Sequence, residues 1–289
     1  MATQTNFPIT KATVRPAKRP AFWGMRTAET ITEKTERLLS AFDPISLAEM
    51  EDVALLNRTD TKFVMPVDSL LKALGRLPGF YRALEIEGRR LHHYQSLYFD
   101  SPEFITYQHH HNGRCNRYKV RFRRYLDSGL AFLEVKCRNN KNRTIKKRVR
   151  RHEINDRLSA DDKHFISGHY PYEVRSLAPS LWNNFHRITL VSTQRKERLT
   201  LDINLGFGDH KAISGLPGIA IAEVKQEGFS MESDFIYQMR WQGIRPSGFS
   251  KYCIGTAIIN PHLKRNRFKT KLLMVDKMMQ GEHNHVYAS

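Results

Sequence analysis

The strongest constraint on the fold of this chain is the positive charge crowded between Arg114 and Arg151. Fifteen Lys and Arg in this segment stand against only Asp127 and Glu134, a local charge of 15 − 2 = +13 within a formal net charge of +18. Cations alternate with apolar residues in it, so a strand here would carry one charged face and one apolar face. Either the charged face meets solvent and an anionic polymer, or it lines a polar channel while the apolar face packs outward against helices.

The same inverted pattern recurs in other strand-like segments, which favours the channel. Residues 198–205 alternate polar side chains at even positions with aliphatic ones at odd positions, and three further pairs share a face: Glu134 with Lys136, Lys146 with Arg148, and Glu223 with Lys225. On a single strand a solvated charged face would be the simpler interpretation. Repetition on four or more strands, with so few acids, indicates an enclosed basic surface. Arginine makes bidentate phosphate contacts and lysine acts as a point charge, so the expected occupant is rich in phosphate.

Composition narrows the class of partner and of compartment. The pI near 9.9 favours an anionic partner, whether nucleic acid, an acidic membrane surface or a phosphate-rich molecule. Cys115, Cys137 and Cys253 are too few and too widely spaced for a disulfide framework or a CxxC metal site. No apolar run approaches the roughly 18 to 20 residues that cross a bilayer. These features predict a cytoplasmic protein. No Walker loop, Rossmann fingerprint or Gly-x-Ser-x-Gly elbow occurs, so any nucleotide would be held mainly by its phosphates.

The periodicity predicts an α+β domain around a large antiparallel sheet. We expect a flexible basic N-terminal tail over residues 1–42, one domain over 43–275, and a C-terminal tail over 276–289. Ser46 with Glu49 predicts a capped helix start. Further helices are expected over 67–77, 102–111, 233–242 and 262–279, and strands over 95–99, 117–125, 131–137, 144–151, 187–192, 198–205 and 218–225.

Several short blocks occur in an order that resembles a known family. They are Arg58-Thr59-Asp60-Thr61-Lys62-Phe63, Tyr98-Phe99-Asp100, Lys119-Val120-Arg121-Phe122-Arg123-Arg124-Tyr125, Leu133-Glu134-Val135-Lys136, Asn142-Arg143-Thr144-Ile145-Lys146-Lys147-Arg148, Phe185-His186-Arg187, Glu197-Arg198-Leu199-Thr200-Leu201-Asp202, Ala222-Glu223-Val224-Lys225 and Ser250-Lys251-Tyr252. In this order they resemble the VTC domain, the polyphosphate polymerase domain of the vacuolar transporter chaperone complex and a branch of the triphosphate tunnel metalloenzymes. The resemblance covers about residues 43–275.

The resemblance implies a fold, a reaction and a set of site residues. The fold is an eight-stranded antiparallel tunnel or barrel with a basic interior, flanked by helices. The reaction transfers the γ-phosphate of ATP to a growing polyphosphate chain with a divalent metal ion, Mn²⁺ or Mg²⁺. By matching positions, the phosphate-binding cations are Lys62, Arg121, Arg123, Lys136, Lys146, Arg187, Arg198, Lys225 and Lys251. Glu223 resembles the metal-binding glutamate, with Glu134 as a second candidate ligand. Lys136, Arg121, Arg123 and Glu223 are the expected catalytic residues.

Two other functions remain open at this stage. A tunnel triphosphatase would hydrolyse tripolyphosphate or a nucleoside triphosphate, but its Glu-x-Glu-x-Lys signature is missing, and Asp60-Thr61-Lys62 stands in the corresponding place. A non-catalytic module would bind polyphosphate or another polyanion. Nucleic acid is the less favoured partner, and a membrane partner is compatible with the sequence. The run His109-His110-His111 is interpreted as the solvent-facing end of a helix that stops at Gly113 rather than as a metal site.

Overall fold

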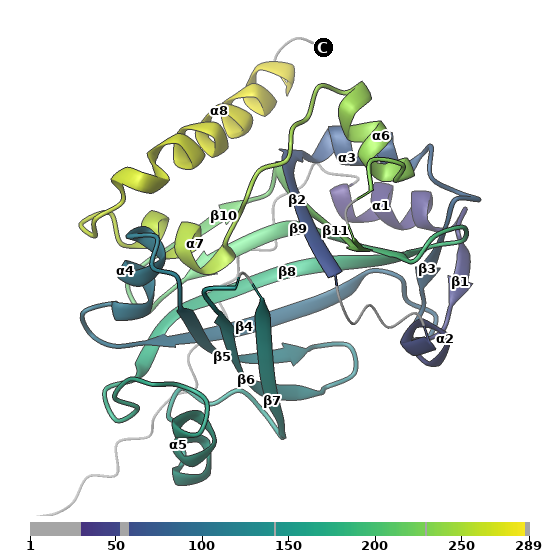
Figure 1. Ribbon diagram of the computed structural model, residues 1–289. Helices are drawn as coiled ribbons and strands as arrows, with labels where there is room; N and C mark the ends of the chain where they lie inside the picture. The colour runs from purple at the N-terminus through teal and green to yellow at the C-terminus, as the bar shows by residue number, and fades with distance from the viewer. Residues whose placement is uncertain (1–29, 53–57, 142, 229, 287–289) are drawn as a thin grey trace, which may run out of the picture.

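The computed structural model describes residues 30–52, 58–141, 143–228 and 230–286, and its centre is an antiparallel sheet (Figure 1). Eight strands follow one another across it in the order β2 (Arg58–Pro66), β11 (Ile219–Glu227), β9 (Glu197–Gly208), β8 (Ala178–Ser192), β4 (His92–Asp100), β5 (Arg117–Tyr125), β6 (Ala131–Arg138) and β7 (Thr144–Arg151). Three short strands join it: β1 (Asp43–Ile45), β3 (Tyr81–Leu84) and β10 (Ile213–Leu216). The expected α+β class with an eight-stranded antiparallel sheet is confirmed.

The sheet is not closed into a barrel, and here the prediction of a sealed tunnel is wrong. Within the described ranges no ladder joins β7 to β2, the two ends of the path. Strand β7 is almost entirely exposed and carries Lys146, Lys147 and Arg148 in succession; charged residues of this kind prevent an edge strand from pairing further.

Although open, the sheet curls so that its two ends approach each other. The cation of Lys62, on β2, lowers the pKa of Lys119 on β5 and of Lys136 on β6, even though four and five strands separate β2 from them in the sheet. A charge acts over such a range only when the side chains lie on the same enclosed side. We call this side the interior face.

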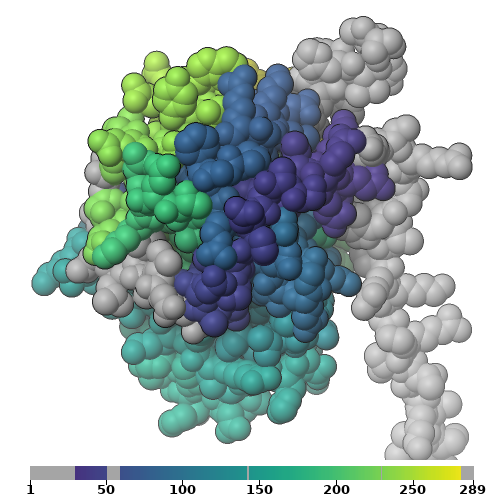
Figure 2. Space-filling model, turned by 90° about the vertical axis from the view of Figure 1, so that its right-hand side faces the viewer, coloured from purple at the N-terminus to yellow at the C-terminus, as the bar shows by residue number. Residues whose placement is uncertain are grey.

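Helices cover the opposite, outer face of the sheet. On β8, β9, β11 and β2, the aliphatic side chains pack against α1 (Ile31–Leu39), α3 (Val67–Leu74) and α6 (Asp234–Trp241). Helix α5 (Ala160–Ser167) and the segment after it cover β4, β5 and β6, with Phe99, Phe122 and Leu133 fully buried beneath them. Figure 2 shows α1, β1 and α2 (Leu47–Asp52) in purple, lying against the blue strands and helix that follow them in the chain.

A third group of helices lies at one end of the interior face. Helices α4 (Ile105–His111), α7 (Lys251–Ile259) and α8 (Lys269–Val286) gather there (Figure 1). Their apolar side chains form one buried cluster with side chains of the interior face: Val64, Tyr98, Phe185, Leu205 and Ile221. This end of the interior is therefore filled with apolar atoms. The polar part of the interior begins at the start of α7, where the Ser250 side chain caps the helix by accepting from the backbone N–H of Cys253.

The helix boundaries correct part of the predicted domain division. Helix α1 lies within the predicted tail of residues 1–42, and Leu39 is 1% exposed in the outer core, so residues 30–42 belong to the folded part. Residues 1–29 and 53–57 lie outside the described part of the chain. Helix α8 runs through the predicted boundary at 275. No helix in the part of the chain that the structure describes combines the length and apolarity that crossing a membrane requires.

Two local predictions are also wrong. The histidine run does not face solvent: His109 and His111 are 7% and 3% exposed, and burial is the main cause that lowers the pKa of His110 to about 2. On β9 the alternation breaks at Asn204, whose φ of 53° lies in the left-handed region. Its side chain turns to the outer face and donates to Thr32 Oγ1 at 3.1 Å, so Leu205 turns inward.

Candidate functional site

The nine predicted phosphate-binding cations lie together on the interior face or at its filled end. By strand these are Lys62 on β2, Lys225 on β11, Arg198 on β9, Arg187 on β8, Arg121 and Arg123 on β5, Lys136 on β6 and Lys146 on β7, with Lys251 at the start of α7. Alternation along β5 and β6, and along β9 as far as Ile203, explains this placement, because the apolar neighbours of these cations pack under the outer helices. The alternation of charged and apolar residues in the sequence therefore corresponds to the interior and outer faces of the sheet.

Glu223 is the centre of the first ion cluster, near β2. Its carboxylate contacts the Nζ of Lys62, and its Oε2 lies 2.9 Å from Lys225 Nζ. Lys225 also donates to Thr200 Oγ1 at 3.0 Å. Burial alone would raise the pKa of Glu223, but the charges of Lys225 and Lys62 hold it well below its ordinary value. Burial lowers the pKa of Lys225 to about 8 despite Glu223.

Asp202 forms the second cluster, over an aromatic surface. Arg187 donates to its two oxygens from Nε and Nη2 at 2.6 and 2.7 Å, and Lys251 contacts the same carboxylate. The Lys251 ammonium and the Arg187 guanidinium lie 4.4 and 5.2 Å from the ring centre of Phe185. Burial would raise the pKa of Asp202, and these two cations lower it instead. Asp202 and its two cations, Arg187 and Lys251, are therefore held in their charged forms beside the apolar cluster that contains α7.

Glu134 forms the third cluster, on β6. Its Oε2 accepts from Arg121 Nε and Nη2 at 2.8 and 2.6 Å, and Arg121 also donates to the Tyr98 hydroxyl at 3.1 Å. The other oxygen, Oε1, lies 3.5 Å from Lys146 Nζ and accepts no hydrogen bond from the described residues. Burial would raise the pKa of Glu134, but Arg121, Arg123 and Lys146 lower it. A fully buried carboxylate oxygen without a hydrogen bond is unusual, so Oε1 of Glu134 keeps unused capacity to accept one or to bind a cation.

Lys136 lies between these clusters and has no carboxylate in direct contact among the described side chains. Burial lowers its pKa to about 7, and the neighbouring cations Lys119 and Arg121 add to that effect while Glu223 opposes it. Lys119 donates to Ser250 Oγ at 3.0 Å, and burial lowers its pKa as well. An anion placed here would favour the ammonium form of both lysines and raise their pKa values.

Charge is distributed unevenly over the interior face. On β5, β6 and β7 it carries nine cations, Arg117, Lys119, Arg121, Arg123, Lys136, Arg138, Lys146, Arg148 and Arg150, and a single carboxylate, Glu134. On β2, β11, β9 and β8 the cations alternate with Asp60, Glu223 and Asp202. The interior face of β5, β6 and β7 therefore has excess positive charge that an anion would balance. The interior face of β2, β11, β9 and β8 holds most of the carboxylate oxygens.

The carboxylates fit a divalent metal ion in one way only. The described residues contain no group of three or more His, Cys, Asp or Glu that could form an all-protein cage. Mg²⁺ and Mn²⁺ are commonly held by one or two carboxylates together with substrate phosphates. Glu223, whose oxygens contact two lysine ammonium groups, and Oε1 of Glu134, which accepts no hydrogen bond from the described residues, suit this shared mode. A metal ion bound this way would supply positive charge to the phosphate oxygens.

Some residues of the site were not singled out from the sequence. Lys119 has the same parity as Arg121, so the alternation could have included it. Tyr98 and Thr200 contribute hydroxyl groups to the cation clusters. Ser250 could have been recognised only by expecting helix α7, because its role depends on capping that helix.

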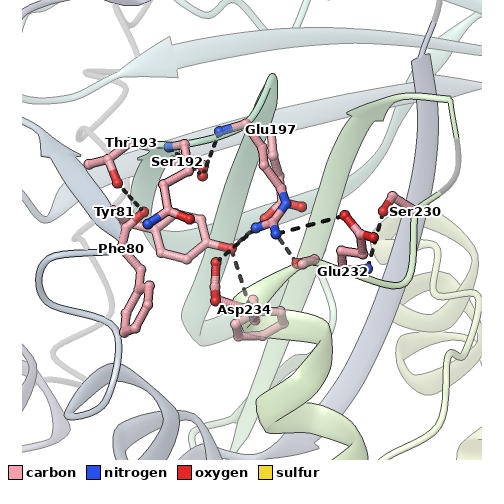
Figure 3. Close-up of polar contacts among 12 residues, drawn as sticks. Phe80, Tyr81, Ser192, Thr193, Glu197, Ser230, Glu232 and Asp234 are labelled. Carbon is pink, nitrogen blue, oxygen red and sulfur yellow. Dashed lines mark hydrogen bonds and ion pairs between the residues drawn. The ribbon is translucent and has the colours of Figure 1, made fainter.

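Glu197 (Figure 3) lies on a different face of the sheet from Asp202, the other acid of the sequence block 197–202. It starts β9 on the outer face, where it is 1% exposed. Its Oε1 accepts from the hydroxyls of Tyr81 and Ser233, the latter at 2.9 Å, and its Oε2 accepts from Gln226 Nε2 at 2.9 Å. Burial raises its pKa, and these neutral donors lower it only in part. The nearby Arg195 pairs with Glu232 and Asp234 at 3.8 and 3.5 Å.

The fold and the site together define an α+β protein whose curled antiparallel sheet holds a basic, partly metal-compatible interior. A family model of the VTC domain matches residues 57–260. The chain belongs to the VTC domain family, and the resemblance found in the short sequence blocks is confirmed. A search of curated proteins finds no match.

Three solved structures with some similarity to this chain are distant from it in sequence. A putative adenylate cyclase from Bacillus halodurans is 13% identical, with a TM-score of 0.41, and the match covers 67% of this chain and 94% of that one. A putative adenylyl cyclase from Hippeastrum, described as having a dominant triphosphatase activity, is 12% identical with a TM-score of 0.41 and coverage of 69% and 95%. The PH1819 protein from Pyrococcus horikoshii OT3 is 14% identical with a TM-score of 0.38 and coverage of 68% and 97%. No residue is assigned from these structures.

Proposed function

We propose that this protein is a metal-dependent polyphosphate polymerase that transfers the γ-phosphate of ATP to a growing polyphosphate chain on the interior face. The observation that carries the proposal is the excess of nine cations over one carboxylate on β5, β6 and β7. Five of these cations, Arg117, Lys119, Arg121, Arg123 and Lys136, are at least partly buried. Cations of the same sign are costly to keep in such a low-dielectric space unless a polyanion neutralises them. Membership of the VTC domain family supports phosphate chains as that polyanion.

The proposed roles follow from position and charge. Arg121, Arg123 and Lys136 hold the transferring phosphates, with Lys62, Lys146, Arg187, Arg198, Lys225 and Lys251 around them. Glu223 is the proposed ligand of Mn²⁺ or Mg²⁺, and Glu134 the second candidate. In-line phosphoryl transfer needs little covalent help, because positioning and charge neutralisation supply most of the barrier reduction. The depressed pKa of Lys136 gives it a part in this: approach of the phosphates favours its ammonium form, which then stabilises the charge on them.

The direct test is incubation of the purified protein with ATP and Mn²⁺, followed by separation of long chains on a gel. We expect wild type to form them, and Glu223→Gln or Lys136→Ala to reduce turnover at least about 100-fold while the circular dichroism spectrum is unchanged, since each variant removes a charge needed in the transition state. A suitable control is Lys147→Gln, on the exposed outer side of β7. Release of free phosphate alone would identify a triphosphatase. Full activity in both variants would refute the site assignment.

A further inference from the structure

The open edge of the sheet presents a row of cations that the proposed transfer site does not use fully. Lys146, Arg148 and Arg150 occupy alternate positions of β7 and face the interior side, opposite Lys136, Glu134 and Phe132 of β6. All three are exposed, and the Lys146 side chain is 44% exposed whereas that of Arg121 is 16%. The row thus leads from the deep cations out to solvent.

We propose that this row, with Arg148 and Arg150 at its outer end, is a binding surface for the part of a polyphosphate chain that extends beyond the phosphates held deep in the interior. The inference rests on the proposed function and adds residues that carry the polymer sideways over β7, at the unpaired edge of the sheet. It explains why the sheet is left open there.

The charges of the row are available to a ligand. Lys146 reaches Glu134 at 3.5 Å, but within the described chain Arg148 and Arg150 form no ion pair with a carboxylate. Consecutive side chains on one face of a strand are about 6.6 Å apart, so one flexible polyanion can contact all three in turn.

The other ways out of the interior suit a polyanion less well. The end near α7 is filled by buried apolar side chains, including Tyr98, Phe185 and Ile221. The facing edge, β2, presents Thr59, Asp60 and Thr61 before Lys62. A chain of phosphates is attracted to the edge where Arg148 and Arg150 form no ion pair with a described carboxylate, whereas Lys62 on β2 is already paired with Glu223.

The surroundings of the row favour polyphosphate over single-stranded nucleic acid. Proteins that bind nucleic-acid strands without sequence preference present aromatic rings on which bases stack. Phe132, the ring beside this row, is already covered by the Arg148 guanidinium, 4.8 Å from its centre. The row therefore offers charge without a free stacking surface.

The experiment compares ligands of different length on the full chain. Affinity is measured by isothermal titration for tripolyphosphate and for long-chain polyphosphate, with wild type, with Arg148→Gln/Arg150→Gln, and with a control of equal charge change, Lys147→Gln/Lys163→Gln, whose residues are exposed away from the row. We expect the row variant to weaken long-chain binding about fivefold to tenfold and tripolyphosphate binding less than about twofold. The control should change neither by more than about twofold.

The outcomes separate the row from the proposed function. An equal loss of affinity for both ligands, or no loss for either, would overturn the row proposal. The proposal would also be overturned if an RNA strand of similar length bound wild type as tightly as polyphosphate and lost affinity equally in the row variant. Polymerase activity with ATP would survive as a finding in each case. Conversely, wild type that forms no polymer but shows the length-dependent loss would refute the polymerase and retain the row.

Discussion

Two acids of the same strand, Asp202 and Glu197, show how the two faces of this sheet treat a buried charge. They are five residues apart on β9, so they face opposite sides, and they are 3% and 1% exposed. Asp202 contacts Arg187 and Lys251, and its pKa is lowered. Glu197 accepts only from uncharged donors such as Tyr81, and its pKa is raised.

The difference teaches that burial alone does not decide the state of a carboxyl group here. Desolvation is the largest single effect on both groups and acts in the same direction. Cations reverse it on the interior face, where Arg187 and Lys251 hold Asp202 in its charged form. On the outer face hydrogen bonds from neutral groups satisfy the carboxyl oxygens and fasten β9 to β3 and α6.

The largest effect should come from breaking the interior side of this comparison. Asp202→Asn leaves Arg187 and Lys251 without their counter-charge, and we expect a loss of about 3 kcal/mol in the free energy of unfolding. The value lies at the lower end for a buried pair because the side chains of the two cations are 17% and 14% exposed. Tripolyphosphate should restore part of the loss by supplying negative charge. Urea unfolding with and without tripolyphosphate measures both quantities.

The control for Asp202→Asn is an ion pair that is exposed to solvent. Lys196 and Glu227 lie 3.1 Å apart with side chains 74% and 56% exposed, so Glu227→Gln should cost less than about 1 kcal/mol. An Asp202→Asn variant as stable as this control, or one that tripolyphosphate does not stabilise relative to wild type, would contradict the account of the interior face.

A smaller effect is expected from the apolar cluster beneath the interior charges. A Cβ at position 255 of α7 would lie 2.8 Å from Phe207 Cε1 and 2.9 Å from Leu181 Cδ2, both in buried side chains. Gly255→Ala should therefore destabilise the protein by about 2 kcal/mol. Because α7 carries Lys251 against Asp202, the variant should also weaken tripolyphosphate binding. Thermal unfolding and isothermal titration measure the two effects.

Gly168→Ala is the matched control for this change. A Cβ there would have its nearest neighbour at 3.7 Å, at the exposed end of α5, so the free energy of unfolding should change by less than about 0.5 kcal/mol. If Gly255→Ala cost no more than Gly168→Ala, the close packing of α7 on β8 and β9 would be refuted.

The sequence predicted β5, β6 and β7 well because alternation is a local signal, whereas β2 was not expected and β8 begins at Ala178 instead of 187. The bounds expected for 117–125 and 144–151 match β5 and β7, and those for 131–137 fall one residue short of β6. Helix α7 was missed because Lys251–Ile259 is almost uniformly apolar and rich in β-branched residues, so it has no helical periodicity. Its position is fixed by tertiary packing of Gly255 on Phe207.

The site was predictable as a set of residues but not as an arrangement. The alternation along each strand predicted that Lys136, Arg121 and Arg198 face the same side of the sheet, and their positions on β6, β5 and β9 confirm this. Which acid pairs with which cation depends on how far the sheet curls, and no local pattern encodes that. Glu197 illustrates the limit: its odd position predicts the outer face, but only the approach of Tyr81 and Ser233 from distant segments explains how a carboxyl group is tolerated there.

The smallest effect tests the outer side of the comparison through pH. The folded pKa of Glu197 lies above its ordinary value of 4.5, so the folded state binds more protons than the unfolded state in the window above pH 4.5. Stability from this group is therefore present below about pH 4.5 and is lost as pH rises through the folded pKa. Glu197→Gln, which cannot ionise, should remove this decline while changing the free energy of unfolding at pH 7 by less than about 1 kcal/mol. Urea unfolding from pH 4.5 to pH 8 measures it.

Two further variants decide whether this slope belongs to Glu197. Tyr81→Phe removes a donor that lowers the pKa of Glu197, so the decline should extend to higher pH than in wild type. Asp202→Asn should have the opposite sign at the acid end: the pKa of Asp202 is depressed below its ordinary value of 3.8, so wild type loses that stability as pH falls below about 3.8, and the variant does not. Superimposable curves for wild type and Glu197→Gln would mean that Glu197 stays ionised in the folded protein at no cost, and the contrast between the two faces would then rest on hydrogen bonding alone.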